Sequence, residues 1–108
     1  MTKIERLDPA LDRLIAADAK IEILAEGYDG TKTRRGLPDG LKVDTEGNLF
    51  ATGPGGVLIL TPHGKHLGTV LTGQATGNCA FGDDGRTLYI TADMYLMRVR
   101  LKTRGLGF

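Results

Sequence analysis

The sequence lacks several residue types on which common protein functions depend. Its 108 residues include no serine, no tryptophan and only one cysteine. Without serine, a hydrolase with a serine nucleophile is excluded. A single cysteine cannot form an intrachain disulfide, so the simplest setting is a reducing one and we expect a cytoplasmic protein.

Charge and hydropathy exclude further classes of protein. The 14 Lys and Arg residues nearly balance the 13 Asp and Glu residues, for a formal net charge of +1. This balance gives no reason to expect nucleic acid or an anionic membrane as a partner. Aromatic residues make up 6% of the chain, too few for a base-stacking surface. No apolar run approaches the roughly 20 residues of a membrane-spanning helix, so we expect one globular domain.

The 16 glycines lie mostly between short apolar runs, which is typical of an all-β chain. Near the N-terminus, Asp8 and Pro9 predict the cap and first residue of a short helix. Leu7, Leu11, Leu14 and Ile15 then share one face of that helix. The runs that predict strands are 21–25, 41–43, 49–52, 57–60, 66–71, 78–81, 87–92 and 95–101.

A unit of about 39 residues occurs twice, which is within the repeat range of propellers. The first copy begins with the turn Gly36–Gly40, and the second copy spans residues 78–91. Asp39 and Asn78 hold the same place in the two copies, just ahead of the first strand of each. Further on, the matching positions are Gly47 and Gly85, Leu49-Phe50 and Leu88-Tyr89, and Thr52 and Thr91.

The predicted fold is all-β, with two four-stranded antiparallel blades of the propeller type. The second copy offers only three strands, and the run Ile21–Ala25 supplies the fourth. We expect one domain over residues 1–108. Its parts are the N-terminal helix and closing strand (1–27), a loop (28–36), the first blade (37–73) and the second blade (74–108).

Two stretches resemble the senescence-marker-protein/gluconolactonase family, also called regucalcin-like, whose members are six-bladed propellers. Residues 7–27 resemble the N-terminal segment of that family, and residues 36–108 resemble its last two blades. Pro38-Asp39-Gly40, followed by a strand and Glu46-Gly47-Asn48-Leu49, carries most of the likeness. The resemblance implies a partial six-bladed propeller from which the middle blades are missing. The missing part includes a glutamate and an asparagine that bind metal in the family.

The resemblance also implies a chemistry. In that family calcium or another divalent cation lies in the central channel and polarises the carbonyl of a sugar lactone. Asp39 matches the aspartate that binds the metal and is the candidate catalytic carboxylate. Asn78 is expected to face the channel and the substrate without binding the metal. Considered without the family, Asp39 between Pro38 and Gly40 is also an ordinary turn residue.

Other candidate residues are expected to be structural. His63 and His66 lie around a turn, with no acidic or cysteine partner at the spacing of metal ligands. Cys79 lies between apolar residues of a strand, as a small core residue does.

Two blades leave two apolar faces uncovered, and repeat folds need about three units or more. Three copies of the chain would supply six blades, so we expect a homotrimer in which three Asp39 side chains converge on the axis. Such a ring would offer a cation several carboxylate oxygens. Two functions follow. One is a truncated sugar-lactone hydrolase, active only if an oligomer rebuilds the channel. The other is a catalytically inactive propeller fragment that acts as an assembly or structural module.

Overall fold

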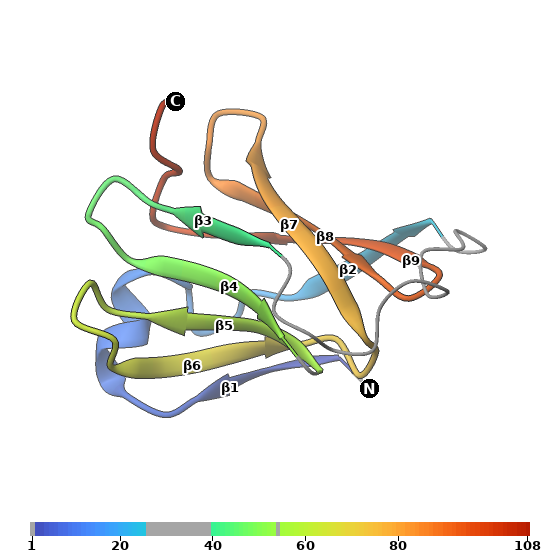
Figure 1. Ribbon diagram of the computed structural model, residues 1–108, viewed down its shortest axis with the longest axis horizontal. Coiled ribbons are helices and arrows are strands. Elements are labelled where there is room, and N and C mark those ends of the chain that lie inside the picture. Colours follow the sequence, from blue (N-terminus) through green and yellow to red (C-terminus); the bar gives the residue numbers. More distant parts are fainter. Residues whose placement is uncertain (1, 26–39, 54) are drawn as a thin grey trace.

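The computed structural model describes residues 2–25, 40–53 and 55–108, and Figure 1 shows their arrangement. A 3-10 helix, η1, spans Pro9–Arg13. Among the described residues, no helix is long and apolar enough to cross a membrane. The strands are β1 (Lys3–Arg6), β2 (Ile21–Ala25), β3 (Leu41–Val43), β4 (Leu49–Gly53), β5 (Gly56–Leu60), β6 (His66–Leu71), β7 (Thr76–Gly82), β8 (Thr87–Ala92) and β9 (Tyr95–Arg100).

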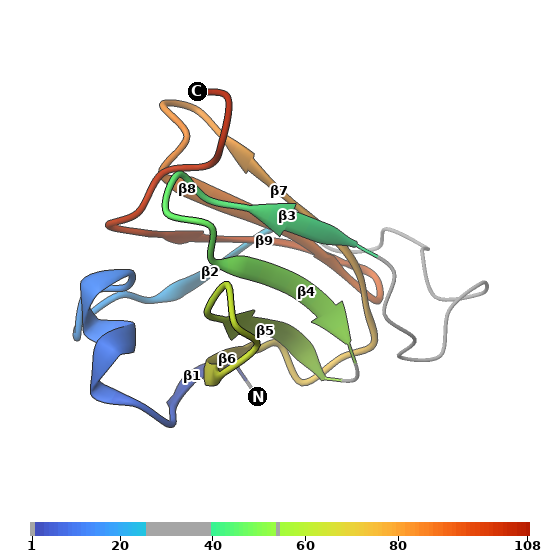
Figure 2. The same cartoon turned by 60° about the vertical axis from the view of Figure 1, so that its left-hand side comes forward.

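The strands form two antiparallel sheets that pack against each other (Figure 2). The first sheet has the order β1-β6-β5-β4-β3, and the second has the order β2-β9-β8-β7. The predicted all-β class with two propeller-type blades is confirmed. So is the closing strand: β2 pairs with β9, and Ile21 lies opposite Val99 although the two residues are far apart in sequence.

The first sheet carries a fifth strand that the sequence did not predict. β1 pairs with β6 along the edge of the first blade, with Lys3 opposite Leu71 and Arg6 opposite Gly68. A Cβ atom built at Gly68 would overlap the carbonyl oxygen of Glu5, so glycine is required for this close approach. A four-residue segment with a single fully apolar residue is too short to show a strand periodicity.

The predicted N-terminal helix forms, as a single 3-10 segment. The Asp8 carboxylate accepts a hydrogen bond from the Ala10 amide at 2.8 Å, and Pro9 is the first helical residue. Leu11 is fully buried and the helix packs on β6, whereas Leu7, predicted on the same face, is 55% exposed because it precedes the helix. Arg6 of β1 stabilises the C-terminal end of the helix and the residues after it. Its guanidinium donates to the Ala16 carbonyl at 2.6 Å and to the Asp12 carboxylate at 2.8 Å.

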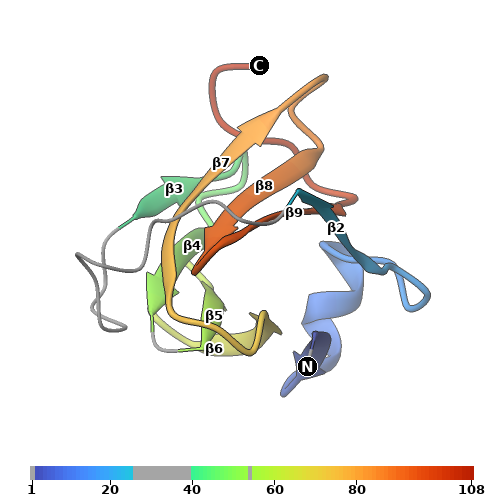
Figure 3. The same cartoon turned by 90° about the vertical axis from the view of Figure 1, so that its right-hand side faces the viewer.

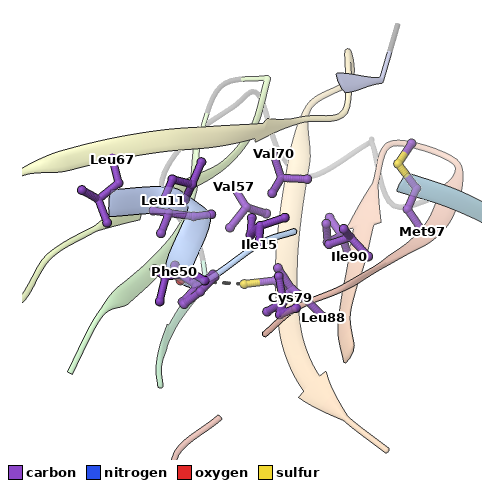
Figure 4. Close-up of a cluster of buried hydrophobic side chains, with 14 of the residues drawn as sticks. Leu11, Ile15, Phe50, Val57, Leu67, Val70, Cys79, Leu88, Ile90 and Met97 are labelled. Carbon is purple, nitrogen blue, oxygen red and sulfur yellow. Dashed lines mark hydrogen bonds between the residues drawn. The ribbon is translucent and has the colours of Figure 1, made fainter. Parts of the chain in front are cut away.

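The core lies between the two sheets and is almost entirely aliphatic (Figure 4). Phe50 of β4 is fully buried and meets Phe81 of β7 edge to face, with ring centroids 5.2 Å apart. Besides Phe50, the fully buried apolar residues that the sheets contribute are Val57, Ile59 and Val70 from the first and Leu88, Ile90, Ala92 and Val99 from the second.

The turn between β7 and β8 forms an ion pair with β9, and the effect of this pair on stability depends on pH. Arg100 donates two hydrogen bonds to Asp84, at 2.9 and 2.8 Å, and the Arg86 amide adds a third at 3.1 Å. These contacts, that of Arg100 above all, lower the pKa of Asp84 from 3.8 to about 2.

The lowered pKa of Asp84 predicts the pH range over which this ion pair ceases to stabilise the fold. A carboxylate with a lowered folded pKa stabilises the folded state above its unfolded pKa, and the effect is lost as the pH falls through the folded value. We therefore expect Asp84→Asn to be slightly less stable than the wild type at pH 7, with the difference closing between pH 4 and pH 2. Urea unfolding at pH 7 and pH 2.5 measures it. A difference that stays constant over this range would contradict the assignment.

Candidate functional site

The first strands of the two blades, β3 and β7, lie next to each other (Figures 1 and 3). Gly40 precedes β3 and is tied to β4: its amide donates to the Thr52 hydroxyl at 2.6 Å, and its carbonyl accepts the Thr52 amide at 2.8 Å. A Cβ atom at Gly40 would overlap the side chain of Asn78 in β7. Glycine at this position therefore permits the contact between the two inner strands.

Asn78 lies on the surface where the two blades meet. Its side chain is exposed, and its Oδ1 accepts the amide of the next residue, Cys79, at 2.8 Å. Asn78 contacts Gly40, and Gly40 directly follows Asp39 in the chain. Asp39 itself, like the expected loop 28–36, lies outside the described residues. The predicted roles of Asp39 as metal ligand and catalytic carboxylate, and of Asn78 as a channel-facing residue, stay predictions.

The equivalence of Asp39 and Asn78 is corrected by one residue. Asn78 pairs with Thr91 in the second blade, whereas Gly40 pairs with Thr52 in the first. Because Thr52 and Thr91 are matching positions, Asn78 corresponds to Gly40. The shift arises in the hairpin turns: five residues lie between the paired Val43 and Leu49, and six lie between the paired Phe81 and Leu88.

A hollow of about 210 Å³ opens beside Asn78. Ligand pockets for small molecules are larger, roughly 300–1,000 Å³, so this hollow is too small to enclose a sugar by itself. It offers polar groups from Lys42, Asn78 and Thr91 next to apolar surface. Its lining residues are Lys42, Asn78, Cys79, Ala80, Tyr89, Thr91 and Leu96.

The described part of one chain does not fit a calcium ion. Over residues 2–25, 40–53 and 55–108, no three His, Cys, Asp or Glu side chains come together as a metal site. Calcium takes about six to eight oxygen ligands. Asn78 supplies one amide oxygen, and that oxygen already accepts the Cys79 amide. His63 is exposed. His66 Nε2 lies 2.9 Å from the Thr69 hydroxyl oxygen, so both histidines have surface or structural positions.

Cys79 is a core residue, as predicted. Its side chain is buried, and its Sγ lies 3.8 Å from the Phe50 carbonyl oxygen (Figure 4). Burial raises the pKa of the Cys79 thiol to about 11, although the positive charge of Lys42 acts in the opposite direction. The thiol is therefore protonated at neutral pH and is a poor nucleophile.

Sequence reasoning missed the importance of Asp44, a residue of the turn between β3 and β4. Asp44 is 1% exposed, and its carboxylate accepts the amides of Glu46 and Asn48 at 2.9 and 2.8 Å. It also accepts the Asn48 side chain at 2.8 Å and the Thr103 hydroxyl at 2.7 Å. Asp two and four residues before its amide donors is a turn signal that could have indicated this role; its contact with Thr103 left no local signal.

Comparisons with known proteins agree with this geometry. A family model described as the SMP-30/Gluconolactonase/LRE-like region matches residues 13–93. A gluconolactonase of Zymomonas mobilis is 50% identical over 72 residues, which cover 65% of this chain and 20% of that protein. This chain therefore spans about a fifth of the length of that relative.

Two solved structures are similar in fold and sequence. An X-ray structure of a provisionally assigned gluconolactonase matches with a TM-score of 0.64 and 44% identity, over 68% of this chain and 26% of that chain. A gluconolactonase of Xanthomonas campestris matches with a TM-score of 0.57 and 35% identity, over 61% of this chain and 22% of that chain. The two blades described above are thus similar to part of each of these proteins.

Proposed function

Because the chain belongs to the SMP-30/gluconolactonase/LRE-like family, we propose that it is a two-blade unit of a sugar-lactone hydrolase, active only where copies of the chain together close a propeller channel. The observation that carries the proposal is the contact between the inner strands. Asn78 of β7 packs against Gly40, the residue that directly follows Asp39. The hollow beside it is too small to serve alone, so a complete site requires surface from another copy.

In the proposed reaction, Asp39 acts as general base. Its carboxylate accepts a proton from the water molecule that attacks the lactone carbonyl. The acyl carbon–oxygen bond of the ring then breaks, and the ring oxygen leaves with that proton as the hydroxyl group of the open sugar acid. The Asn78 amide would orient the hydroxyl groups of the sugar.

Calcium or another divalent cation is the cofactor that the family resemblance implies. The described residues of one chain do not fit it, so no step above depends on it. A homotrimer would bring three Asp39 carboxylates to one axis, and with them more of the oxygen ligands that calcium requires. Calcium dependence is therefore proposed for the assembly and not for the single chain.

An alternative is a catalytically inactive propeller fragment that acts as an assembly or structural module. Two observations favour it. The described residues contain no metal-binding cluster, and the matches cover only 20 to 26% of the gluconolactonases compared above.

Hydrolysis of gluconolactone separates the two functions. The rate is measured above that of buffer with calcium and with a chelator, for the wild type and for Asp39→Ala. Asp18→Ala is the matched control, since it removes an exposed carboxylate far along the chain from the site. We expect calcium-dependent hydrolysis that Asp39→Ala lowers at least a hundredfold, because general bases contribute about 10²–10⁴-fold. Rates equal to that of buffer in every case would leave the assembly module as the function.

A further inference from the structure

We propose that copies of this chain bind head to tail, with the outer face of the first sheet of one copy packed against the outer face of the second sheet of the next. These surfaces are called face one and face two. Face one is the side of the first sheet turned away from the second, and its residues are Leu41, Val43, Leu49, Ala51, Leu58 and Leu60. Face two is the side of the second sheet turned away from the first, and its residues are Asn78, Ala80, Tyr89, Thr91, Leu96 and Arg98.

The internal repeat makes face one the equivalent of the side of the second sheet that packs on the first sheet. It makes face two the equivalent of the side of the first sheet that packs on the second. Phe50 matches Tyr89 in the repeat, and Leu49 matches Leu88. Phe50 points toward the second sheet, where it meets Phe81, and Leu88 points back toward the first sheet and is fully buried. Successive residues of a strand point to opposite faces. Leu49 therefore points away from the second sheet, and Tyr89 points away from the first.

Face one has the composition of a surface that packs against another blade. In the second sheet, four of the side chains that dock on the first sheet are between 0 and 1% exposed: Leu88, Ile90, Met97 and Val99. Strand register places their equivalents in the first sheet at Leu49, Ala51, Leu58 and Leu60. These four are also apolar, yet they are only half-buried, and neighbouring Leu41 is 59% exposed.

Face two is the equivalent of the surface on which the second sheet docks. In the first sheet that surface consists of buried side chains, with Phe50 and Ile59 in one row and Thr52 and Val57 in the next. The matching rows of face two contain Tyr89 with Arg98 and Thr91 with Leu96, all of them half-buried. Arg98 is held by Glu22 at 2.8 Å, which leaves its aliphatic stem available for packing.

Each copy thus carries one docking surface of each kind, and the occupant of face one is face two of a second copy. The packing of the two sheets within the chain gives the geometry of the contact between chains. A contact between unlike surfaces is heterologous, and its repetition closes a ring or grows into a filament. This inference deepens the proposed function, because three two-sheet copies joined in this way give the six-bladed ring on which the channel depends.

Complementation between two blocked variants tests the head-to-tail contact. Leu58→Arg places a charge in face one, and Leu96→Arg places one in face two. His63→Arg, in an exposed turn outside both faces, is the control. Light scattering should give three times the chain mass of 11.6 kDa for the wild type and the control. Each blocked variant alone should be a monomer, its self-association weakened at least a hundredfold, because a charge buried without a partner is strongly unfavourable.

The mixture is the decisive measurement. Leu58→Arg keeps face two and Leu96→Arg keeps face one, so an equimolar mixture should form a dimer and nothing larger. Circular dichroism confirms that the variants fold, and Ala51→Arg with Thr91→Arg is a second pair if one of them does not. A folded wild-type monomer would overturn the inference. So would a Leu96→Arg protein that still assembles while Leu58→Arg does not, because that result indicates a contact of face one with itself. An assembly of the expected mass that fails to hydrolyse lactones would remove the proposed activity and leave this contact standing.

Discussion

Asp44→Ala is expected to lower the free energy of unfolding by about 3–5 kcal/mol, because several buried hydrogen-bond donors lose their acceptor at once. Asp44 is 1% exposed and accepts four hydrogen bonds. Its removal leaves the amides of Glu46 and Asn48 and the side chains of Asn48 and Thr103 without this acceptor. Each buried group that loses its partner costs about 1–3 kcal/mol. Urea unfolding of the wild type and the variant measures the difference.

Glu46→Ala is the matched control, because Glu46 is an exposed carboxylate in the same turn. The ion pair of Glu46 with Arg13, at 3.5 Å, is also exposed, so a change within about 0.5 kcal/mol is expected. Thr103→Val isolates one of the four hydrogen bonds and should cost about 1–3 kcal/mol. If Asp44→Ala were as mild as Glu46→Ala, the buried network would not stabilise the fold.

The position of Asp44 explains why its loss should affect the whole chain. The β3–β4 hairpin belongs to the first blade, while Thr103 follows the last strand of the second blade. Asp44 also forms an isolated β-bridge with Gly105. The network therefore fastens the C-terminal segment to the first blade, at the edge where β3 has no further strand of its own sheet.

Most of the fold could be predicted from the sequence because its signals are local. Alternating apolar residues and glycine-rich turns located the strands of both blades, and the missing fourth strand of the second blade pointed to Ile21–Ala25. Two features had no local signal. β1 is only four residues long, and its place depends on how closely Gly68 approaches Glu5. The bond between Asp44 and Thr103 joins residues that are 59 positions apart.

The candidate site could be predicted less completely, for a physical reason. Repeat alignment counts residues, but strand pairing decides which of them lie side by side. Counted between equivalent strand pairs, the turn that follows β7 is one residue longer than the turn that follows β3, and this places Asn78 at the level of Gly40. The alignment therefore identified the correct strand and the correct edge of the blade, and it missed by one residue the contact that brings the two inner strands together.

Phe50→Ala is expected to lower the free energy of unfolding by about 3–5 kcal/mol, as large-to-small changes of buried aromatic residues do. Phe50 is fully buried between the sheets and packs against Phe81. Its carbonyl lies next to the Cys79 sulfur, so the cavity would open where the two blades meet. Chemical unfolding measured at a protein concentration low enough to keep the chain monomeric gives the value.

Tyr89→Ala is the matched comparison for Phe50→Ala, because Tyr89 is the repeat equivalent of Phe50 on face two. Tyr89 is only half-buried in one chain, and its hydroxyl bonds Asp83 at 2.8 Å. Its removal should therefore cost clearly less than that of Phe50 in dilute protein. At higher concentration the two residues should become alike, since a second copy would bury Tyr89 as the second sheet buries Phe50. Equal costs in dilute protein would contradict the assignment of the two faces, and a Tyr89→Ala effect that does not grow with concentration would contradict their pairing between copies.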